Sequence, residues 1–146
     1  MKVDRKTFFK LLVLCLLPIF MFGGCSVSSD DDVDIVKRGK YLVLDGEDFD
    51  NPDWMISHES SYIRVFSFKR IDGEYEITFS GILFWKDNYG NSHYQNIPVK
   101  TISMVRIDDY LYETKFRSDP YVGIEVFDDE NFDLYTDDFL VNLYLE

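Results

Sequence analysis

The dipeptide Asp72-Gly73 constrains the fold of this chain more than any other feature of the sequence. Asp-Gly favours the left-handed backbone conformations of a type I′ turn, which joins the two strands of a tight β-hairpin. On both sides of the dipeptide, apolar and polar residues alternate with the two-residue period of a strand that has one buried face. The sequence therefore predicts an antiparallel hairpin of two strands over residues 61–71 and 74–86.

A two-residue turn also sets which residues of the two strands lie opposite each other. On the solvent face, Lys69 is expected opposite Glu76 and Ser67 opposite Thr78. Arg64 falls on the core face opposite Gly81, and two explanations stay open: a β-bulge at Gly81 turns Arg64 outward, or a pocket receives the arginine. The remaining core-face pairs are Phe68 with Ile77, Phe66 with Phe79, and Tyr62 with Leu83.

The same alternation recurs along the rest of the chain, and no helical stripe is evident. Pro98 should separate two strands or lie at a sheet edge, because proline cannot donate to a sheet ladder. A short helical turn is expected at 54–58. We predict an all-β fold of about eight strands, either an antiparallel β-sandwich or a closed meander barrel. Besides the hairpin, strands are expected at 40–45, 92–97, 99–107, 110–116, 121–127 and 138–146.

The first 24 residues have the pattern of a secretory signal. Four basic residues and one acid lie in residues 1–10, and residues 11–22 are all apolar. Twelve helical residues reach about 18 Å at about 1.5 Å per residue, whereas the hydrocarbon core of a bilayer is about 30 Å thick. The apolar run is therefore too short to be a membrane span.

The segment Phe22-Gly23-Gly24-Cys25 resembles the lipobox of bacterial lipoproteins, in which an aliphatic residue and two small residues precede the lipidated cysteine. Here Phe22 stands where leucine is commonest. The resemblance implies that residues 1–24 are removed and that Cys25 carries diacylglycerol on sulfur, usually with a third acyl chain on nitrogen. The alternative is an ordinary secretory signal, which needs small residues before the cut. Several acyl chains together would hold the protein on a membrane.

Residues 26–34 form a run of serine and aspartate that looks like the acidic tether of lipoproteins exported to the outer face of the outer membrane in some Gram-negative lineages. The alternative is a solvated linker, because a run of aspartates cannot bury itself. We therefore expect a signal peptide over 1–24, a flexible tether over 25–38 and a single all-β domain over 39–146. The expected location is the outer membrane, with the domain facing the exterior.

Charge and cysteine content exclude several classes of function. Removal of residues 1–24 would leave 11 basic and 26 acidic side chains, a formal charge of −15. Nucleic acids and anionic lipids need cationic surfaces, so neither is expected as a partner of the domain, whereas cations, basic proteins and neutral glycans are permitted. Cys15 lies in the leader and Cys25 would be lipidated, so no thiol remains for a disulfide, a metal site or a nucleophile.

Catalytic motifs are absent from the sequence, and we predict a protein that is not an enzyme and has no cofactor. His58, Glu59, Ser60 and Ser61 supply the residue types of a hydrolytic triad. Adjacent residues of an extended segment point apart, however, and a triad is defined by its geometry.

Two acidic stretches contain the oxygen ligands that Ca²⁺ prefers. In the second, 128–133, an alternation like that of an EF-hand begins at Asp129, but Leu134 replaces the required glycine and Leu140 the closing glutamate. The alternative for both stretches is a solvated turn. The candidate ligands of the first stretch are Asp45, Glu47, Asp48, Asp50, Asn51 and Asp53.

The segment 85–94 is the strongest candidate for a binding site, because aromatic rings alternate there with amide and carboxylate groups. An aromatic face can cover the apolar side of a sugar while polar groups satisfy its hydroxyls, and loops at sheet ends commonly carry such sites. Alternatively, Trp85 and Tyr94 close the core and Tyr89 caps a turn. The candidate ligand-binding residues are Trp85, Asn88, Tyr89, Asn91, His93 and Tyr94.

Two kinds of function remain open for the domain: a glycan or small-ligand binding module, and a protein-interaction subunit of a cell-surface assembly. An exposed groove lined by Trp85, Tyr89 and Tyr94 would favour the first. An unpaired, apolar edge formed by the terminal strand would favour the second, through strand addition.

Overall fold

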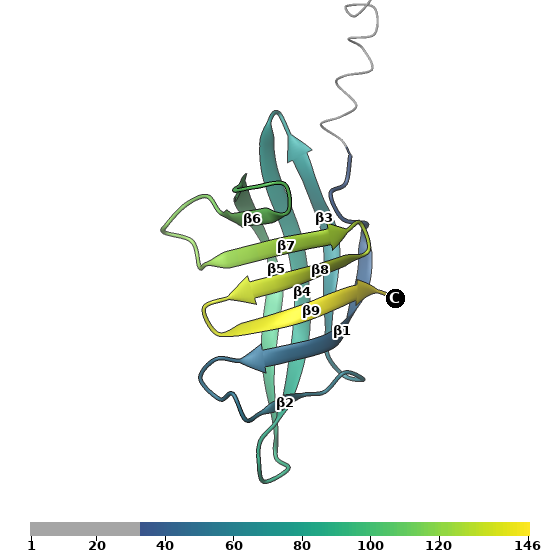
Figure 1. Cartoon of the computed structure of the whole chain (residues 1–146), viewed down its shortest axis with the longest axis vertical. Coiled ribbons are helices and arrows are strands. Elements are labelled where there is room, and N and C mark those ends of the chain that lie inside the picture. Colours follow the sequence, from purple (N-terminus) through teal and green to yellow (C-terminus); the bar gives the residue numbers. More distant parts are fainter. Residues whose placement is uncertain (1–32) are drawn as a thin grey trace, which may run out of the picture.

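The computed structural model describes residues 33–146, which form strands, turns and loops without a helix (Figure 1). No helix in this range is therefore available to cross a membrane. The predicted signal peptide, Cys25 and most of the predicted tether lie outside the described residues. The strands are β1 (Gly39–Asp48), β2 (Met55–Ile56), β3 (Tyr62–Ile71), β4 (Glu74–Lys86), β5 (Ser92–Arg106), β6 (Leu111–Thr114), β7 (Val122–Asp128), β8 (Asn131–Thr136) and β9 (Phe139–Leu145).

The sheet is a closed meander barrel. Apart from β2, each strand pairs antiparallel with its neighbours in the chain, and β9 pairs with β1 to close the ring of eight strands. β2 adds to the end of β4, beyond the point where β3 stops. The predicted all-β class is thus confirmed, and of its two expected architectures the barrel is correct. Alternate residues of the strands fill the interior, with the largest buried side chains from Trp85, Tyr41, Phe68, Phe79, Phe132 and Phe139.

The Asp72-Gly73 hairpin forms as predicted, with positive φ angles of 51° and 80° at its two turn residues. The expected register holds from Ile71 opposite Glu74 to Ser67 opposite Thr78, and then shifts by one residue. Phe66 is the extra residue of this bulge and is 42% exposed. The expected core pairs of Phe66 with Phe79 and of Tyr62 with Leu83 are therefore wrong.

The bulge at Phe66 also explains the orientation of Arg64, which is exposed and lies opposite Ser80. Gly81 lies opposite Ile63 instead, in a close approach of the two backbones. A Cβ atom on Gly81 would be 2.4 Å from the carbonyl oxygen of Tyr62 and 2.7 Å from Cδ1 of Ile63. Arg64 is thus turned outward as one of the two explanations expected, but the responsible bulge is on β3.

Other differences concern residues whose local pattern is ambiguous. The two strands expected on either side of Pro98 are one strand, β5, in which the exposed Pro98 lies beside a shift of register with β4. The expected helical turn at 54–58 contains the short strand β2. β8 was not expected, because Asp133 interrupts the alternation; Phe132, Asp133 and Leu134 are all buried.

The ring of strands is complete, but one part of the barrel wall lacks strand pairing. β6 has only four residues and pairs with β5 only from Met104 to Arg106. Between Ser92 and Ile102, β5 is therefore paired with β4 alone. The side chains on the inner face of this segment border an opening where the wall of a complete barrel would otherwise cover them.

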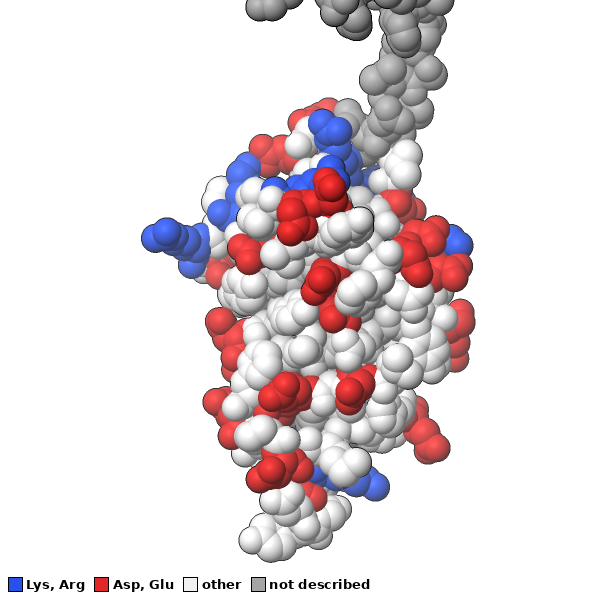
Figure 2. All heavy atoms as spheres, in the orientation of Figure 1, with Lys and Arg blue, Asp and Glu red and all other residues white. Residues whose placement is uncertain are grey.

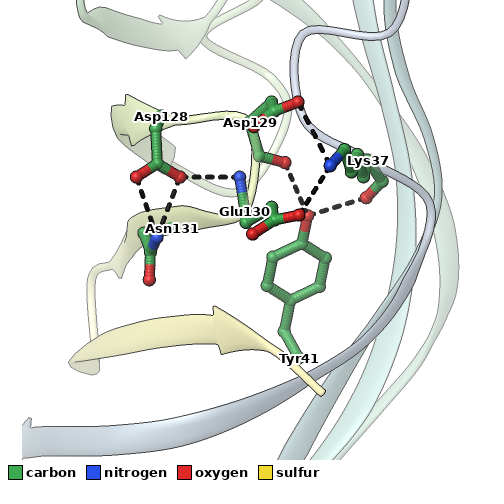
Figure 3. A network of polar contacts seen from close by, with 6 residues as sticks. All are labelled: Lys37, Tyr41, Asp128, Asp129, Glu130 and Asn131. Atoms are coloured by element: carbon green, nitrogen blue, oxygen red, sulfur yellow. Dashed lines mark hydrogen bonds and ion pairs between the residues drawn. The ribbon is translucent and has the colours of Figure 1, made fainter.

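The second acidic stretch closes the turn between β7 and β8, and Figure 3 shows its contacts. Asp128 Oδ1 accepts hydrogen bonds from the backbone N–H of Glu130 and from Asn131 Nδ2, both at 2.8 Å. Lys37 Nζ lies 2.5 Å from Glu130 Oε1, and the Tyr41 hydroxyl donates to the carbonyl oxygens of Lys37 and Asp129. These carboxylates thus order a turn and tie the start of the described chain to it.

Candidate functional site

Asp87 organises the turn between β4 and β5, the segment in which the sequence predicted a ligand-binding loop. Its Oδ1 accepts hydrogen bonds of 2.9 Å from the backbone N–H groups of Tyr89 and Asn91, and its Oδ2 lies 2.9 Å from His93 Nε2. These contacts lower the pKa of Asp87 to about 2, with the hydrogen bond from His93 as the largest cause. The carboxylate therefore stays ionised and fixes both the turn and the His93 ring.

The predicted ring residues of this hairpin point in different directions. Trp85 faces the interior and is only 2% exposed, whereas Tyr89 at the tip of the turn is 91% exposed. Tyr94 is also exposed, on the outer side of β5, where its ring lies 6.2 Å from that of Phe84. Trp85 thus belongs to the core as the alternative expectation held, but Tyr94 does not.

Trp54, which the sequence did not single out, comes from the loop between β1 and β2. Its indole stacks on the His93 imidazole, with ring centroids 4.1 Å apart and planes at 18°. Because His93 lies opposite Trp85 in the β4–β5 ladder, the Trp54 ring is held beside the buried indole. The half-buried Trp54 extends the apolar surface of the core to the exterior.

A groove of about 300 Å³ opens beside these rings, and we call it the β5 groove. It collects residues from the loop after β1, from β4 and β5, and from the turn between β8 and β9. Aromatic surface, carboxylates and carboxamides all contribute, whereas no lysine or arginine does. The lining residues are Asp48, Asp50, Asn51, Trp54, Trp85, His93, Tyr94, Gln95 and Asp138.

The buried Trp85 indole has an unusual feature inside this groove. Among the described residues, its Nε1 has no hydrogen-bond partner, although it is shielded from solvent. Buried donors in native proteins nearly always have a partner, and an unpaired one raises the free energy of the fold by about 1 to 3 kcal/mol. The side chain that carries this unpaired donor is also one of those that line the groove.

A smaller cavity of about 140 Å³ adjoins the β5 groove at the open part of the barrel wall, and we call it the Lys100 cavity. It shares Gln95 and Asp138 with the groove. Gln95 and Lys100 lie opposite the buried Leu83 and Phe79 in the ladder, so both occupy the inner face of β5. Polar residues at inward positions of a strand were a signal in the sequence that pattern reading overlooked.

The structure divides the predicted site residues among different surfaces. The β5 groove brings together Trp85, His93 and Tyr94 of the predicted sugar site. Asn88 lines a separate depression of about 740 Å³ together with Asp53, His58 and Lys86. Tyr89 and Asn91 line none of these three hollows. A groove is therefore present beside Trp85 and Tyr94, but it is not the groove lined by all three rings that the sequence analysis described, because Tyr89 lies outside it.

The predicted calcium ligands do not converge. Asp48 and Asp50 line the β5 groove, whereas Asp45 and Glu47 lie elsewhere along β1. Asp48 Oδ1 accepts a hydrogen bond of 2.8 Å from the backbone N–H of Asn51, as a turn carboxylate does. Within residues 33–146, no three His, Cys, Asp or Glu side chains are grouped in a way that would hold a metal ion.

His58 and Ser61 are engaged with the backbone. His58 Nδ1 lies 3.0 Å from the carbonyl oxygen of Val43, and the buried Ser61 Oγ accepts a hydrogen bond of 2.8 Å from the backbone N–H of Phe84. Their roles are thus to join the loop after β2 to β1 and to β4. No hydrolytic triad is assembled from this pair.

The terminal strand does not provide the unpaired edge that would favour strand addition. The terminal strand β9 pairs with β1 on one side and with β8 on the other, so the expected unpaired edge is absent there. Among the described strands, β5 has a free flank, where Pro98 lacks an N–H donor and a shift of register interrupts the ladder. Proline and bulges are devices that discourage the pairing of an edge with another chain.

Fold and site together describe a closed eight-stranded barrel with a polar and aromatic groove at a gap in its wall. Comparisons with protein families, with curated proteins and with solved structures found no match.

Proposed function

We propose that this protein is a lipid-anchored accessory protein of the outer membrane whose barrel binds a glycan in the β5 groove. The observation that carries the proposal is the Trp85 indole Nε1, a buried donor without a partner that belongs to a groove-lining side chain. A sugar hydroxyl is an acceptor of suitable size for this donor. In the proposed complex, a ligand oxygen accepts the hydrogen bond that Trp85 Nε1 does not donate to any described residue.

The other groove residues have the chemistry that sugar binding uses. Trp54 supplies an aromatic face whose position is held by the stack on His93. Asn51 and Gln95 supply amides that both donate and accept, and Asp48 and Asp138 supply acceptors for hydroxyl groups. Concave sites with apolar walls and a few placed polar groups are typical of small-ligand binding.

The position of the groove suits a domain that is anchored through its N-terminal tether. The described chain starts beside the Asp72-Gly73 end of the barrel, where Asp34 forms a bridge with Lys69. The groove lies towards the far end of β4, a strand of 13 residues that spans roughly 40 Å. Figure 1 places β2 and the β4–β5 turn at the end opposite the start of the described chain. An anchor at Cys25 would therefore leave the groove facing away from the membrane.

The surface charge is compatible with this orientation. In the view of Figure 2, acidic side chains are spread over the barrel, whereas most lysine and arginine atoms gather at the end with the Asp72-Gly73 turn. Basic side chains near a bilayer are attracted to anionic headgroups. This orientation thus brings the end with most of the visible basic side chains towards the lipid, although Lys37, Arg38 and Arg106 are each paired with a carboxylate.

A glycan array followed by calorimetry tests the proposal. The full-length protein in detergent micelles should retain at least one glycan, and Trp54→Ala should weaken that complex by about ten- to a hundredfold, because few contacts carry most of the binding free energy. Tyr110→Ala, which removes an exposed ring far from the groove, is the matched control and should bind as the wild type does.

Tyr89→Ala distinguishes glycan binding in the β5 groove from glycan binding at the tip of the β4–β5 hairpin. If binding depends on Tyr89 and not on Trp54, the site is the exposed turn and the groove assignment is wrong. If no glycan binds the wild-type protein, the glycan-binding proposal is wrong as a whole.

A further inference from the structure

Lys100 is a cation in an unusual position, on the inner face of a barrel strand. It lies opposite the buried Phe79 in the β4–β5 ladder, and its Nζ is 5.4 Å from the centroid of the Phe79 ring. The side chain is half-buried and lines the Lys100 cavity, together with Tyr121 and Phe139 among others. The side chain therefore borders the hollow, with its ammonium group over the Phe79 ring.

Residues 33–146 supply no counter-ion for this ammonium group. Lys37, Lys40 and Lys115 each pair with a carboxylate of the described residues. Lys100 forms no such ion pair, although Asp137 and Asp138 also border the cavity. Burial lowers the pKa of Lys100, and no neighbouring carboxylate offsets that effect. Desolvated charges in proteins are normally paired, because removal of an ion from water is unfavourable.

The Lys100 cavity and the β5 groove are adjacent parts of one surface. Gln95 and Asp138 line both, so a ligand seated on Trp54 and Trp85 can extend to Lys100 without leaving the protein. The groove end presents carboxylates, which accept hydrogen bonds from hydroxyl groups, and the cavity end adds the Lys100 cation beside Asp137 and Asp138. A ligand with hydroxyls at one end and an anionic group at the other complements both.

We infer that Lys100 binds a carboxylate of the ligand, so that the glycan recognised by the β5 groove is an acidic one, with a uronic or sialic acid residue seated in the Lys100 cavity. This inference rests on the proposed glycan-binding function and adds the ligand class. The Phe79 ring behind the ammonium group and the shielding from solvent strengthen a Lys–carboxylate contact relative to one on an open surface. The strongly acidic remainder of the domain repels anions, so selectivity depends on this single cation.

Acidic glycans and their carboxyl methyl esters provide the test, because esterification removes the charge and keeps the sugar ring. The probes are oligogalacturonate, oligoglucuronate and sialyllactose, each as the free acid and as the methyl ester, titrated into the full-length protein in micelles. At least one free acid should bind about tenfold or more tightly than its ester. Lys100→Gln should bind acid and ester equally, at the affinity of wild type for the ester.

Lys86→Gln is the matched control, because Lys86 is exposed and lies outside both the groove and the cavity. It should retain the preference for the acid. Added salt should weaken the acid complex of the wild type and leave the ester complex unchanged, because salt screens charge pairs.

A measurement on the wild-type protein covers the case in which Lys100→Gln does not fold. With ¹³C-labelled lysine, the Lys100 side-chain resonance should shift when the free acid saturates the protein and stay in place with the ester. Equal affinity for acid and ester, or a Lys100 resonance that does not move in the acid complex, overturns the inference while leaving a neutral glycan as ligand. Absence of binding to every acid, ester and neutral glycan overturns the proposed function and this inference with it.

Discussion

Trp54 and His93 form a ring stack that joins the loop between β1 and β2 to the open flank of β5, with centroids 4.1 Å apart. His93 is held in turn by Asp87, whose other oxygen orders the β4–β5 turn. Trp54, a groove-lining ring that lies on a loop, is thus fixed in place by a chain of contacts from a turn carboxylate. This arrangement positions an aromatic face before any ligand binds, which lowers the entropy that binding must overcome.

The pKa of Asp87 reports on this chain of contacts. In the wild type, the Asp87 carboxyl should titrate at about pH 2, and in His93→Ala its pKa should rise, because the hydrogen bond from His93 is the largest cause of the shift. A carboxyl whose pKa is lowered by folding stabilises the fold above its unfolded pKa of about 3.9, and the contribution disappears as the pH falls through 2. Carboxyl ¹³C shifts measured against pH check the prediction. Asp128, whose pKa is lowered by the Glu130 N–H, is the internal control.

The bulge at Phe66 separates two phenylalanines that simple alternation would place together. Phe79→Ala should lower the free energy of unfolding by about 3 to 5 kcal/mol, because it leaves a cavity in the core. Phe66→Ala, at a side chain that is 42% exposed, should lower it by less than about 1.5 kcal/mol. Urea denaturation of both variants provides the comparison, and equal losses would mean that Phe66 is a core residue after all.

Asp133 should make the fold less stable as the pH rises. It is buried between Glu125 on β7 and Asn142 on β9, and burial raises its pKa despite the hydrogen bond that Asn142 donates. Folding therefore favours the protonated form, and the associated stability is complete below about pH 3.9 and is lost as the pH rises through the raised pKa.

Asp133→Asn keeps this position neutral at every pH. The difference in unfolding free energy between the variant and the wild type should therefore shift in favour of the variant from pH 3 to pH 7, as measured by urea denaturation at each pH. Parallel curves for the two proteins would show that folding leaves the pKa of Asp133 unchanged.

Lipidation at Cys25 remains a prediction from the sequence and is tested in cells. Cys25→Ser should abolish labelling by a palmitate analogue, because the thioether that carries diacylglycerol cannot form. Protease added to intact cells should remove the wild-type domain if it faces the exterior. Unchanged labelling of Cys25→Ser would exclude the lipidation, and resistance to protease until lysis would place the domain in the periplasm.

The sequence by itself determined the strand class and the first hairpin, because these depend on residues close together in the chain. The Asp72-Gly73 turn needs two positive φ angles, which Asp and Gly tolerate, and the flanking alternation sets the neighbouring pairs. The Trp85–Tyr94 segment likewise shows its mixture of rings and amides directly. Residues close together in the chain were sufficient to predict each of these features.

The tertiary structure alone decided how the strands close and which side chains meet. The bulge at Phe66 brings Ile63 opposite Gly81, a contact that no turn rule contains. β8 forms around a buried Asp133 because β7 and β9 cover it on both sides. Trp54, His93 and Lys100 come to one surface only because the short β6 leaves β5 unpaired along part of its length. Such contacts join residues far apart in the chain, and the closure of a barrel depends on all its strands at once, so no local pattern encodes them.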